Sequence, residues 1–120
     1  MKIVVGGQVE KKEIESLVKQ FGGDGIDVTV KADLEAAMML KTGEADYYVG
    51  ACHTGGGGAL AMAIALLGKP ACATISMPGK KPVKENVQSA VEQGAKAFGF
   101  TGDHKEKAIE YLMAALKKEK

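Results

Sequence analysis

Arginine and tryptophan are absent from this chain of 120 residues, and cysteine occurs only twice. Without arginine, an anion must be held by lysine or by backbone amides, because no guanidinium group is available for a bidentate contact. Two cysteines in a chain of this length do not make a disulfide scaffold. The formal net charge is only +1 and no basic block is present, so we expect no nucleic-acid partner, because counterion release requires clustered cations.

Long apolar runs are also missing. The first residues turn polar by Gln8, and we therefore expect no signal peptide. The longest apolar stretch, residues 58–68, is far shorter than the ~20 residues of a membrane-spanning helix, so we expect no membrane partner. Hydrophobic residues make up 46% of the chain and charged residues 26%, which excludes a disordered protein. We expect one cytoplasmic domain over residues 1–120.

Short β-branched runs alternate with helical patterns along the chain, which is typical of βαβ units and a parallel sheet. The patterns predict strands at residues 3–6, 26–30, 47–51, 71–77 and 97–100, the second of them at an edge. They predict helices at residues 14–21, 34–40 with Asp33 as cap, 58–68, from 82 or 83, and 108–116. We therefore predict a three-layer, doubly wound α/β sandwich, Rossmann-like or flavodoxin-like, with a five-stranded parallel sheet in the order 2-1-3-4-5.

The predicted third helix has no polar face. Its sequence, Gly-Ala-Leu-Ala-Met-Ala-Ile-Ala-Leu-Leu-Gly at residues 58–68, indicates a helix that is buried on nearly all sides. In so small a domain, a helix of this kind indicates a subunit interface. We therefore expect a homodimer.

Ligands of such sheets bind beyond the carboxyl ends of the strands, where the winding reverses, here between the first and third strands. Glycines let the backbone approach a ligand, and the free amides of a helix's first turn attract anions. The segments after these two strands predict a site for a small anionic metabolite; an alternative is that the glycines only permit a tight turn. The candidate ligand-binding residues are Gly6, Gly7, Gln8, His53, Gly55, Gly56, Gly57 and Gly58, with Ser76 and Thr101 at the same rim.

Cys52 lies just before those amides, where a positive helix terminus favours a thiolate that acts as nucleophile or general base. The alternative is a small buried apolar residue. His53 is its neighbour in sequence, but neighbours at a strand end tend to point to opposite sides, so a paired Cys-His arrangement does not follow, and a solvated histidine is the alternative.

The other polar residues do not indicate a cofactor or metal. Cys52 and Cys72 are expected roughly 15 Å apart from the rise of a strand, too far for a disulfide. With His53 and His104, they lack the ligand spacing of a structural zinc site. No P-loop lysine follows the glycines, so we expect no cofactor. Asp103 and Glu106 resemble a helix capping box, which leaves His104 without a predicted role.

Residues 46–55, Asp-Tyr-Tyr-Val-Gly-Ala-Cys-His-Thr-Gly, and residues 33–38, Asp-Leu-Glu-Ala-Ala-Met, resemble the YhfU-like family of small bacterial proteins of unknown function. The resemblance extends over essentially the whole chain. It implies a link to small-molecule catabolism, because the family's genes accompany a predicted transporter and metabolic enzymes.

A second resemblance implies a mechanism. Residues 52–57, Cys-His-Thr-Gly-Gly-Gly, are similar to the Cys-Gly-Thr-Gly-x-Gly loop of the type B ribose phosphate isomerase family, and Ala97-Phe98-Gly99 is similar to its Ala-Phe-Gly. In that family the cysteine moves a proton between adjacent carbons. The resemblance implies that Cys52 is the base, that Thr54 supports the loop and that the amides of residues 55–57 hold the anion. Gly7 and Gln8 replace the family's Asp-His pair, and its His-Asn segment and arginines have no counterpart.

These features leave more than one function open. The first is a metabolite-binding, isomerase-like enzyme that uses Cys52 for proton transfer. The second is a non-catalytic metabolite-binding or regulatory subunit of a catabolic or transport system. A carrier that is covalently modified at Cys52 is a further alternative. This alternative is weaker, because Cys52 follows the third strand and not the first.

Overall fold

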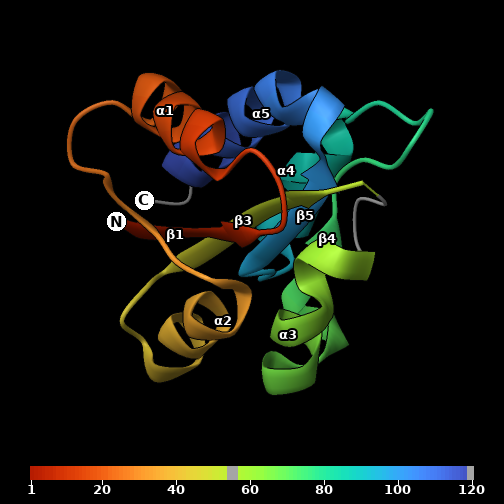
Figure 1. Ribbon diagram of the computed structural model, residues 1–120. Helices are drawn as coiled ribbons and strands as arrows, with labels where there is room; N and C mark the ends of the chain where they lie inside the picture. Colours follow the sequence, from red (N-terminus) through yellow and green to blue (C-terminus); the bar gives the residue numbers. More distant parts are fainter. Residues whose placement is uncertain (54–56, 119–120) are drawn as a thin grey trace.

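The computed structural model (Figure 1) describes residues 1–53 and 57–118, and strands and helices alternate along the chain as predicted. The strands are β1 (Lys2–Gly7), β2 (Asp27–Val30), β3 (Tyr47–Cys52), β4 (Cys72–Thr74) and β5 (Ala97–Thr101). The helices are α1 (Lys11–Gly22), α2 (Asp33–Thr42), α3 (Gly57–Leu67), α4 (Lys84–Glu92) and α5 (Lys105–Lys118), with short 3₁₀ turns η1 (Lys69–Ala71) and η2 (Gly102–His104).

The five strands form one all-parallel sheet in the order β2-β1-β3-β5-β4. The α/β class, the five parallel strands and the edge position of β2 are confirmed, whereas the predicted order 2-1-3-4-5 is wrong at its last two positions. All residues of β5 are buried, while β4 has three residues and is partly exposed. An interior strand of a parallel sheet is covered on both faces, so the apolar β5 occupies the inner position and the short β4 the edge.

The exchange of β4 and β5 determines which face of the sheet α4 covers. Parallel crossovers are right-handed, so a connection that runs back along the sheet places its helix on the opposite face from one that runs forward. The connection from β4 back to β5 therefore places α4 beside α5, on the face that α1 also covers (Figure 1). The other face carries α2 and α3, which pack against each other.

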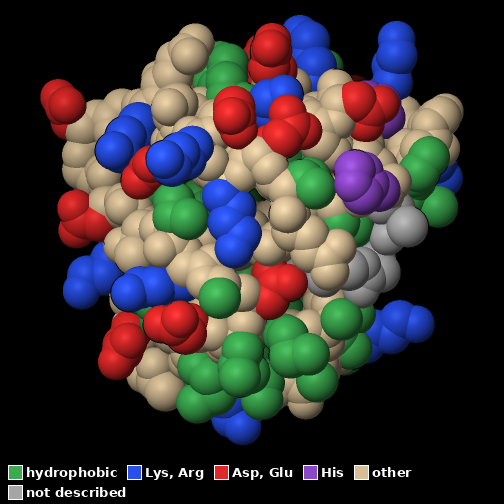
Figure 2. Space-filling view, in the orientation of Figure 1, with side chains coloured by type: hydrophobic (Ala, Val, Ile, Leu, Met, Phe, Trp, Pro, Cys, Tyr) green, Lys and Arg blue, Asp and Glu red, His purple; other side chains and the backbone are tan. Residues whose placement is uncertain are grey.

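This arrangement leaves one side of α3 without cover in the single chain. Leu60 and Ala63 are buried, but Met62 is 41% exposed and Ile64 is 37% exposed. The expectation that this helix is buried on nearly all sides is therefore wrong within one chain. Figure 2 shows apolar side chains gathered over α2 and α3, where Leu34 and Met38 of α2 are also exposed. None of the helices in the described ranges has the length and apolar character to span a membrane.

The sequence predicted that Asp33 caps α2, and this prediction is wrong. Ala32 is the cap residue, and Asp33 lies in the first turn of the helix. Asp33 Oδ1 instead accepts a hydrogen bond from the hydroxyl of Tyr48, at 3.3 Å. The same hydroxyl accepts a hydrogen bond from the backbone N–H of Gly7, at 3.0 Å. Burial raises the pKa of Tyr48, and the charge of Asp33 raises it further, so the phenol stays protonated and keeps both partners.

The ring of Tyr48 also explains why a glycine stands near the end of β1. A Cβ atom at Gly6 would lie 2.6 Å from Tyr48 Cε2, closer than two carbon atoms can approach. The absence of a side chain at Gly6 therefore leaves space for the Tyr48 ring. The ring places its hydroxyl next to Gly7, at the end of β1.

We expect Gly6→Ala to lower the free energy of unfolding by about 1–3 kcal/mol, the usual cost of overpacking a core. Because the clash is with the ring, the double variant Gly6→Ala/Tyr48→Leu should be less destabilised than the sum of the two single variants. Urea unfolding of the four proteins in this cycle measures the coupling. Strictly additive losses would show that Tyr48 does not impose the glycine.

Candidate functional site

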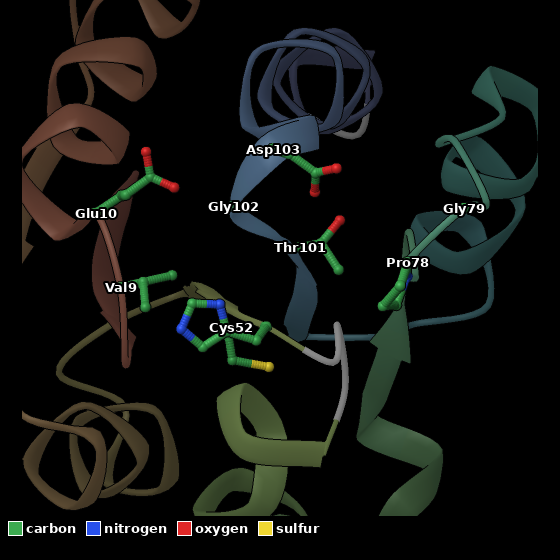
Figure 3. A pocket seen from close by; sticks show the side chains of 9 residues that line it. Val9, Glu10, Cys52, Pro78, Gly79, Thr101, Gly102 and Asp103 are labelled. Carbon is green, nitrogen blue, oxygen red and sulfur yellow. The ribbon is translucent and has the colours of Figure 1, made fainter.

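A cavity of about 320 Å³ lies at the carboxyl edge of the sheet, where ligands of such folds bind. It is lined by the segments that follow β1, β3 and β5, and by the loop before α4. Figure 3 shows Cys52 and Thr101 at its floor, with Glu10 and Asp103 on either side above them. The structure therefore brings together Cys52, His53 and Thr101 of the predicted site residues.

Cys52 and Thr101 are neighbours because β3 and β5 are paired, and the two residues are opposite each other in the register. Cys52 is 1% exposed and Thr101 is 2% exposed, although both border the cavity. Cys52 is thus buried, as the alternative for this residue predicted, and it also borders the candidate site. The predicted strand order separated these two residues by a strand, so the sequence did not indicate their contact.

Other predicted site residues lie elsewhere. Gly6, Gly7 and Gln8 do not border the cavity; the N–H of Gly7 is bonded to Tyr48, and the N–H of Gln8 donates to Ala51 O at 2.9 Å. Val9 and Glu10 line the cavity in their place. Thr54, Gly55 and Gly56 lie outside the described residues, and Gly57 and Gly58 begin α3. The predicted anion contacts of these residues stay predictions.

Ser76 does not border the cavity but is hydrogen-bonded to Thr101. The Thr101 N–H donates to Ser76 Oγ at 3.0 Å, and the two hydroxyl oxygens are 3.2 Å apart. Thr101 Oγ1 is in turn 2.7 Å from His104 Nδ1. His104 thus has a partner, which the sequence analysis missed; the signal was the spacing of a strand-end threonine and a histidine three residues later.

Asp103 also differs from the capping-box prediction. It lies in η2, before α5 begins at Lys105, and its Oδ2 is 3.8 Å from His104 Nε2. A hydrogen bond from the Thr101 hydroxyl lowers the pKa of Asp103, and the charge of His104 acts in the same direction. Asp103, Thr101 and His104 therefore form one polar cluster at the wall of the cavity.

Glu10 was not predicted as a site residue. It has a positive φ of 54°, the one such case outside glycine within residues 1–53 and 57–118. Its carboxylate forms an ion pair with Lys105 Nζ at 2.8 Å, and the hydrogen bond that Lys105 donates to Glu10 raises the pKa of Lys105. A Cβ atom at Gly102 would collide with the Glu10 carboxylate, so the glycine at the start of η2 is required by this arrangement.

The cavity therefore combines a thiol, a hydroxyl hydrogen-bonded to an imidazole, and two carboxylates. Such groups exchange protons with a bound molecule when they lie within hydrogen-bonding reach. In the part of the chain that the structure describes, no group of three or more His, Cys, Asp or Glu side chains could hold a metal ion. The side chains at hand are suited to acid–base chemistry.

The fold is similar to solved structures named as type B ribose 5-phosphate isomerases. The structure from Giardia lamblia matches with a TM-score of 0.73 and 16% identity, over 98% of this chain and 94% of that chain. The structure from Trypanosoma brucei matches with a TM-score of 0.71 and 18% identity, over 97% of this chain and 85% of that chain. At these identities the similarity shows a common Rossmann-type fold.

The sequence comparisons extend over nearly the whole chain. The uncharacterised protein YhfU of Escherichia coli K12 is 39% identical over 116 residues, which are 97% of this chain and 98% of that protein. YhfU of Shigella flexneri matches equally well. The family model described as "Protein of unknown function DUF2620" matches residues 1–116. The chain therefore belongs to the DUF2620/YhfU family.

Proposed function

We propose that this chain binds a small metabolite with a phosphate or carboxylate group in the cavity beside Cys52, and that Cys52 moves a proton between adjacent carbons of that metabolite. One observation carries the proposal: Cys52 borders the cavity at the end of β3, shortly before α3 begins. The amino end of a helix carries a partial positive charge, which stabilises both a bound anion and a thiolate.

The similarity to solved structures gives the first compound to test as a ligand. The solved structures of the same fold carry names that state an action on ribose 5-phosphate. Proton transfer next to a carbonyl needs a base at the carbon and a site that stabilises the negative charge on oxygen. Cys52 supplies the base, and the amides at the start of α3 supply the second part of the proposed site.

A binding function without catalysis is the second candidate, and the segment after β1 favours it. The N–H groups of Gly7 and Gln8 are bonded within the protein, and neither residue borders the cavity. This segment therefore offers no acid–base group of its own before Glu10. In this alternative the protein is the metabolite-binding or regulatory subunit of a catabolic or transport system.

Ligand binding should raise the melting temperature in proportion to affinity and ligand concentration. We expect a saturable rise with at least one member of a panel of ribose 5-phosphate, other sugar phosphates, inorganic phosphate and small carboxylates. A thermal-shift titration measures it. A melting temperature that is unchanged across the panel at millimolar concentrations would contradict an anion site in this cavity.

The variant Cys52→Ser should lower turnover of the bound compound by about 10²-fold or more, the usual contribution of a positioned base, while its Kd changes little. Cys72→Ser is the matched control, because Cys72 lies in β4 with its Sγ 3.6 Å from Gly68 O and does not border the cavity. Product formation and calorimetric binding are the two measurements. Equal turnover in Cys52→Ser and wild type would remove Cys52 from the mechanism, and binding without product in wild type would favour the regulatory subunit.

We further propose that a second copy of this chain covers the apolar face of α2 and α3. The segment 57–67 contains no charged residue, so this helix offers no group for ion pairing with an unrelated partner. Leu34, Met38, Met62 and Ile64 are exposed on this face, and an apolar patch of this kind is suited to a self-complementary contact about a twofold axis.

The variant Ile64→Lys should convert this dimer into a monomer, because a charge buried at the contact has no partner there. Val83→Lys is the control, since Val83 is a similarly exposed apolar residue located just before α4. Sedimentation equilibrium at micromolar concentration distinguishes the two states. A wild-type protein that is monomeric under these conditions would contradict the interface.

A further inference from the structure

The hydroxyl of Thr101 has one proton and two competing acceptors. Its oxygen is 2.7 Å from His104 Nδ1, a short distance for an O–H···N hydrogen bond. The Asp103 carboxylate is the second acceptor near this hydroxyl, and its interaction with Thr101 lowers the pKa of Asp103. Figure 3 shows the Asp103 carboxylate and the Thr101 hydroxyl pointing toward each other. The hydroxyl has one proton, so it can donate to His104 or to Asp103 but not to both, and the choice depends on whether His104 Nδ1 carries a proton.

Each state of His104 gives a complete set of donors and acceptors. When Nδ1 carries no proton, Thr101 donates to His104, and Ser76, which already accepts from the Thr101 N–H, donates its own hydroxyl proton to Thr101 Oγ1. When Nδ1 is protonated, it donates to Thr101 Oγ1, and Thr101 donates to Asp103. The cluster is therefore satisfied in two arrangements that differ by one proton on His104.

The cluster also separates two cavities. Thr101 and Asp103 border the cavity that contains Cys52. His104 and Asp103 border a second cavity of about 440 Å³, next to α5 and the loop before α4. The His104 side chain is 14% exposed, so its ring is within reach of water on that outer side. A proton that reaches Thr101 from the Cys52 cavity can thus leave through the imidazole.

We propose that Thr101 and His104 form a proton relay between a ligand oxygen in the Cys52 cavity and the outer cavity. This relay rests on the proposed function, because it requires a ligand beside Thr101. The ligand hydroxyl gives its proton to Thr101 Oγ1 as the Thr101 proton passes to His104 Nδ1. The ligand is then an alkoxide and His104 an imidazolium; the reverse transfer restores both, so no proton is gained or lost.

The relay gives the cavity two proton-transfer groups with different tasks. Cys52 acts on a proton bound to carbon, and Thr101 acts on a proton bound to oxygen, as a shift of a carbonyl between adjacent carbons requires. Thr101 is the residue that touches the ligand, and His104 is a positioning residue that acts through it. The register of β3 and β5 places the two groups on adjacent strand ends.

Charged groups from three elements face His104. The outer cavity is lined by Lys81 from the loop before α4, Asp103 from η2, and Lys105, Glu106, Lys107 and Tyr111 from α5. Lys105 is paired with Glu10 and Lys107 with Glu110, at 2.8 and 3.4 Å. Asp103, whose Oδ2 is 3.8 Å from Nε2, is therefore the carboxylate placed to stabilise the imidazolium.

The first test uses turnover of the panel compound that Cys52 converts. Thr101→Val and His104→Gln should each lower kcat by about 10²-fold with little change in KM, the size expected for loss of a proton-transfer group. Thr101→Ser keeps the hydroxyl and should restore most of the activity. Thr42→Val is the matched control, because the Thr42 hydroxyl contacts Met39 O at the end of α2, away from both cavities.

The second test needs no ligand. The chain has two histidines, so ¹⁵N NMR signals of His104 are assigned by their absence from His104→Gln. We expect Nδ1 without a proton and Nε2 with one at alkaline pH, and a changed Nδ1 signal in Thr101→Val but not in Thr42→Val. A proton on Nδ1 at all pH values, or the same Nδ1 signal in wild type and Thr101→Val, would overturn the relay whatever the ligand.

The outcomes separate the relay from the proposed function. Full turnover in His104→Gln, with turnover lost in Cys52→Ser, would overturn the relay and leave the proposed function intact. Turnover that is lost in Thr101→Val but not restored in Thr101→Ser would also contradict it. If no panel compound shifts the wild-type melting temperature, both proposals fail together. The absence of a shift distinguishes this outcome from a failure of the relay alone.

Discussion

The buried hydroxyl of Tyr48 is the contact on which the architecture of the site depends. It joins the N–H of Gly7 at the end of β1 to the carboxylate of Asp33 in α2, beneath the carboxyl edge of the sheet. A buried polar group without a partner is costly, so this three-way contact fixes the place where the chain leaves β1. The next residues, Val9 and Glu10, are thereby directed to the cavity that Cys52 borders.

The inner position of β5 has effects on both faces of the sheet. It places Thr101 opposite Cys52 and so creates the floor of the cavity. It also brings α4 to the face of α1 and α5, which leaves the outer side of α3 apolar and exposed. The cavity and the exposed face of α2 and α3 thus have a common origin in one change of strand order.

The sequence predicted the elements well because periodicity and glycines mark them locally: the apolar stripe of α1 ends at Gly22 and Gly23, as expected. It did not predict the order of β4 and β5, because strand pairing is a non-local property and both runs are apolar. Cys52 and Thr101 were identified from their places at strand ends. Glu10 was missed because its partner, Lys105, lies far away in the sequence, after β5. The contact of His104 with Thr101 is local, and it was missed because Asp103 was interpreted as a helix cap, which gave His104 no partner.

Gly102 has a consequence for how the entrance of the cavity can vary. The Glu10 carboxylate rests where a side chain at position 102 would be, and Lys105 holds it there. Any larger residue would push this acid aside and change both the aperture and the polarity of the opening. A single substitution at Gly102 can therefore change which molecules enter the cavity, while Cys52 and Thr101 keep their positions.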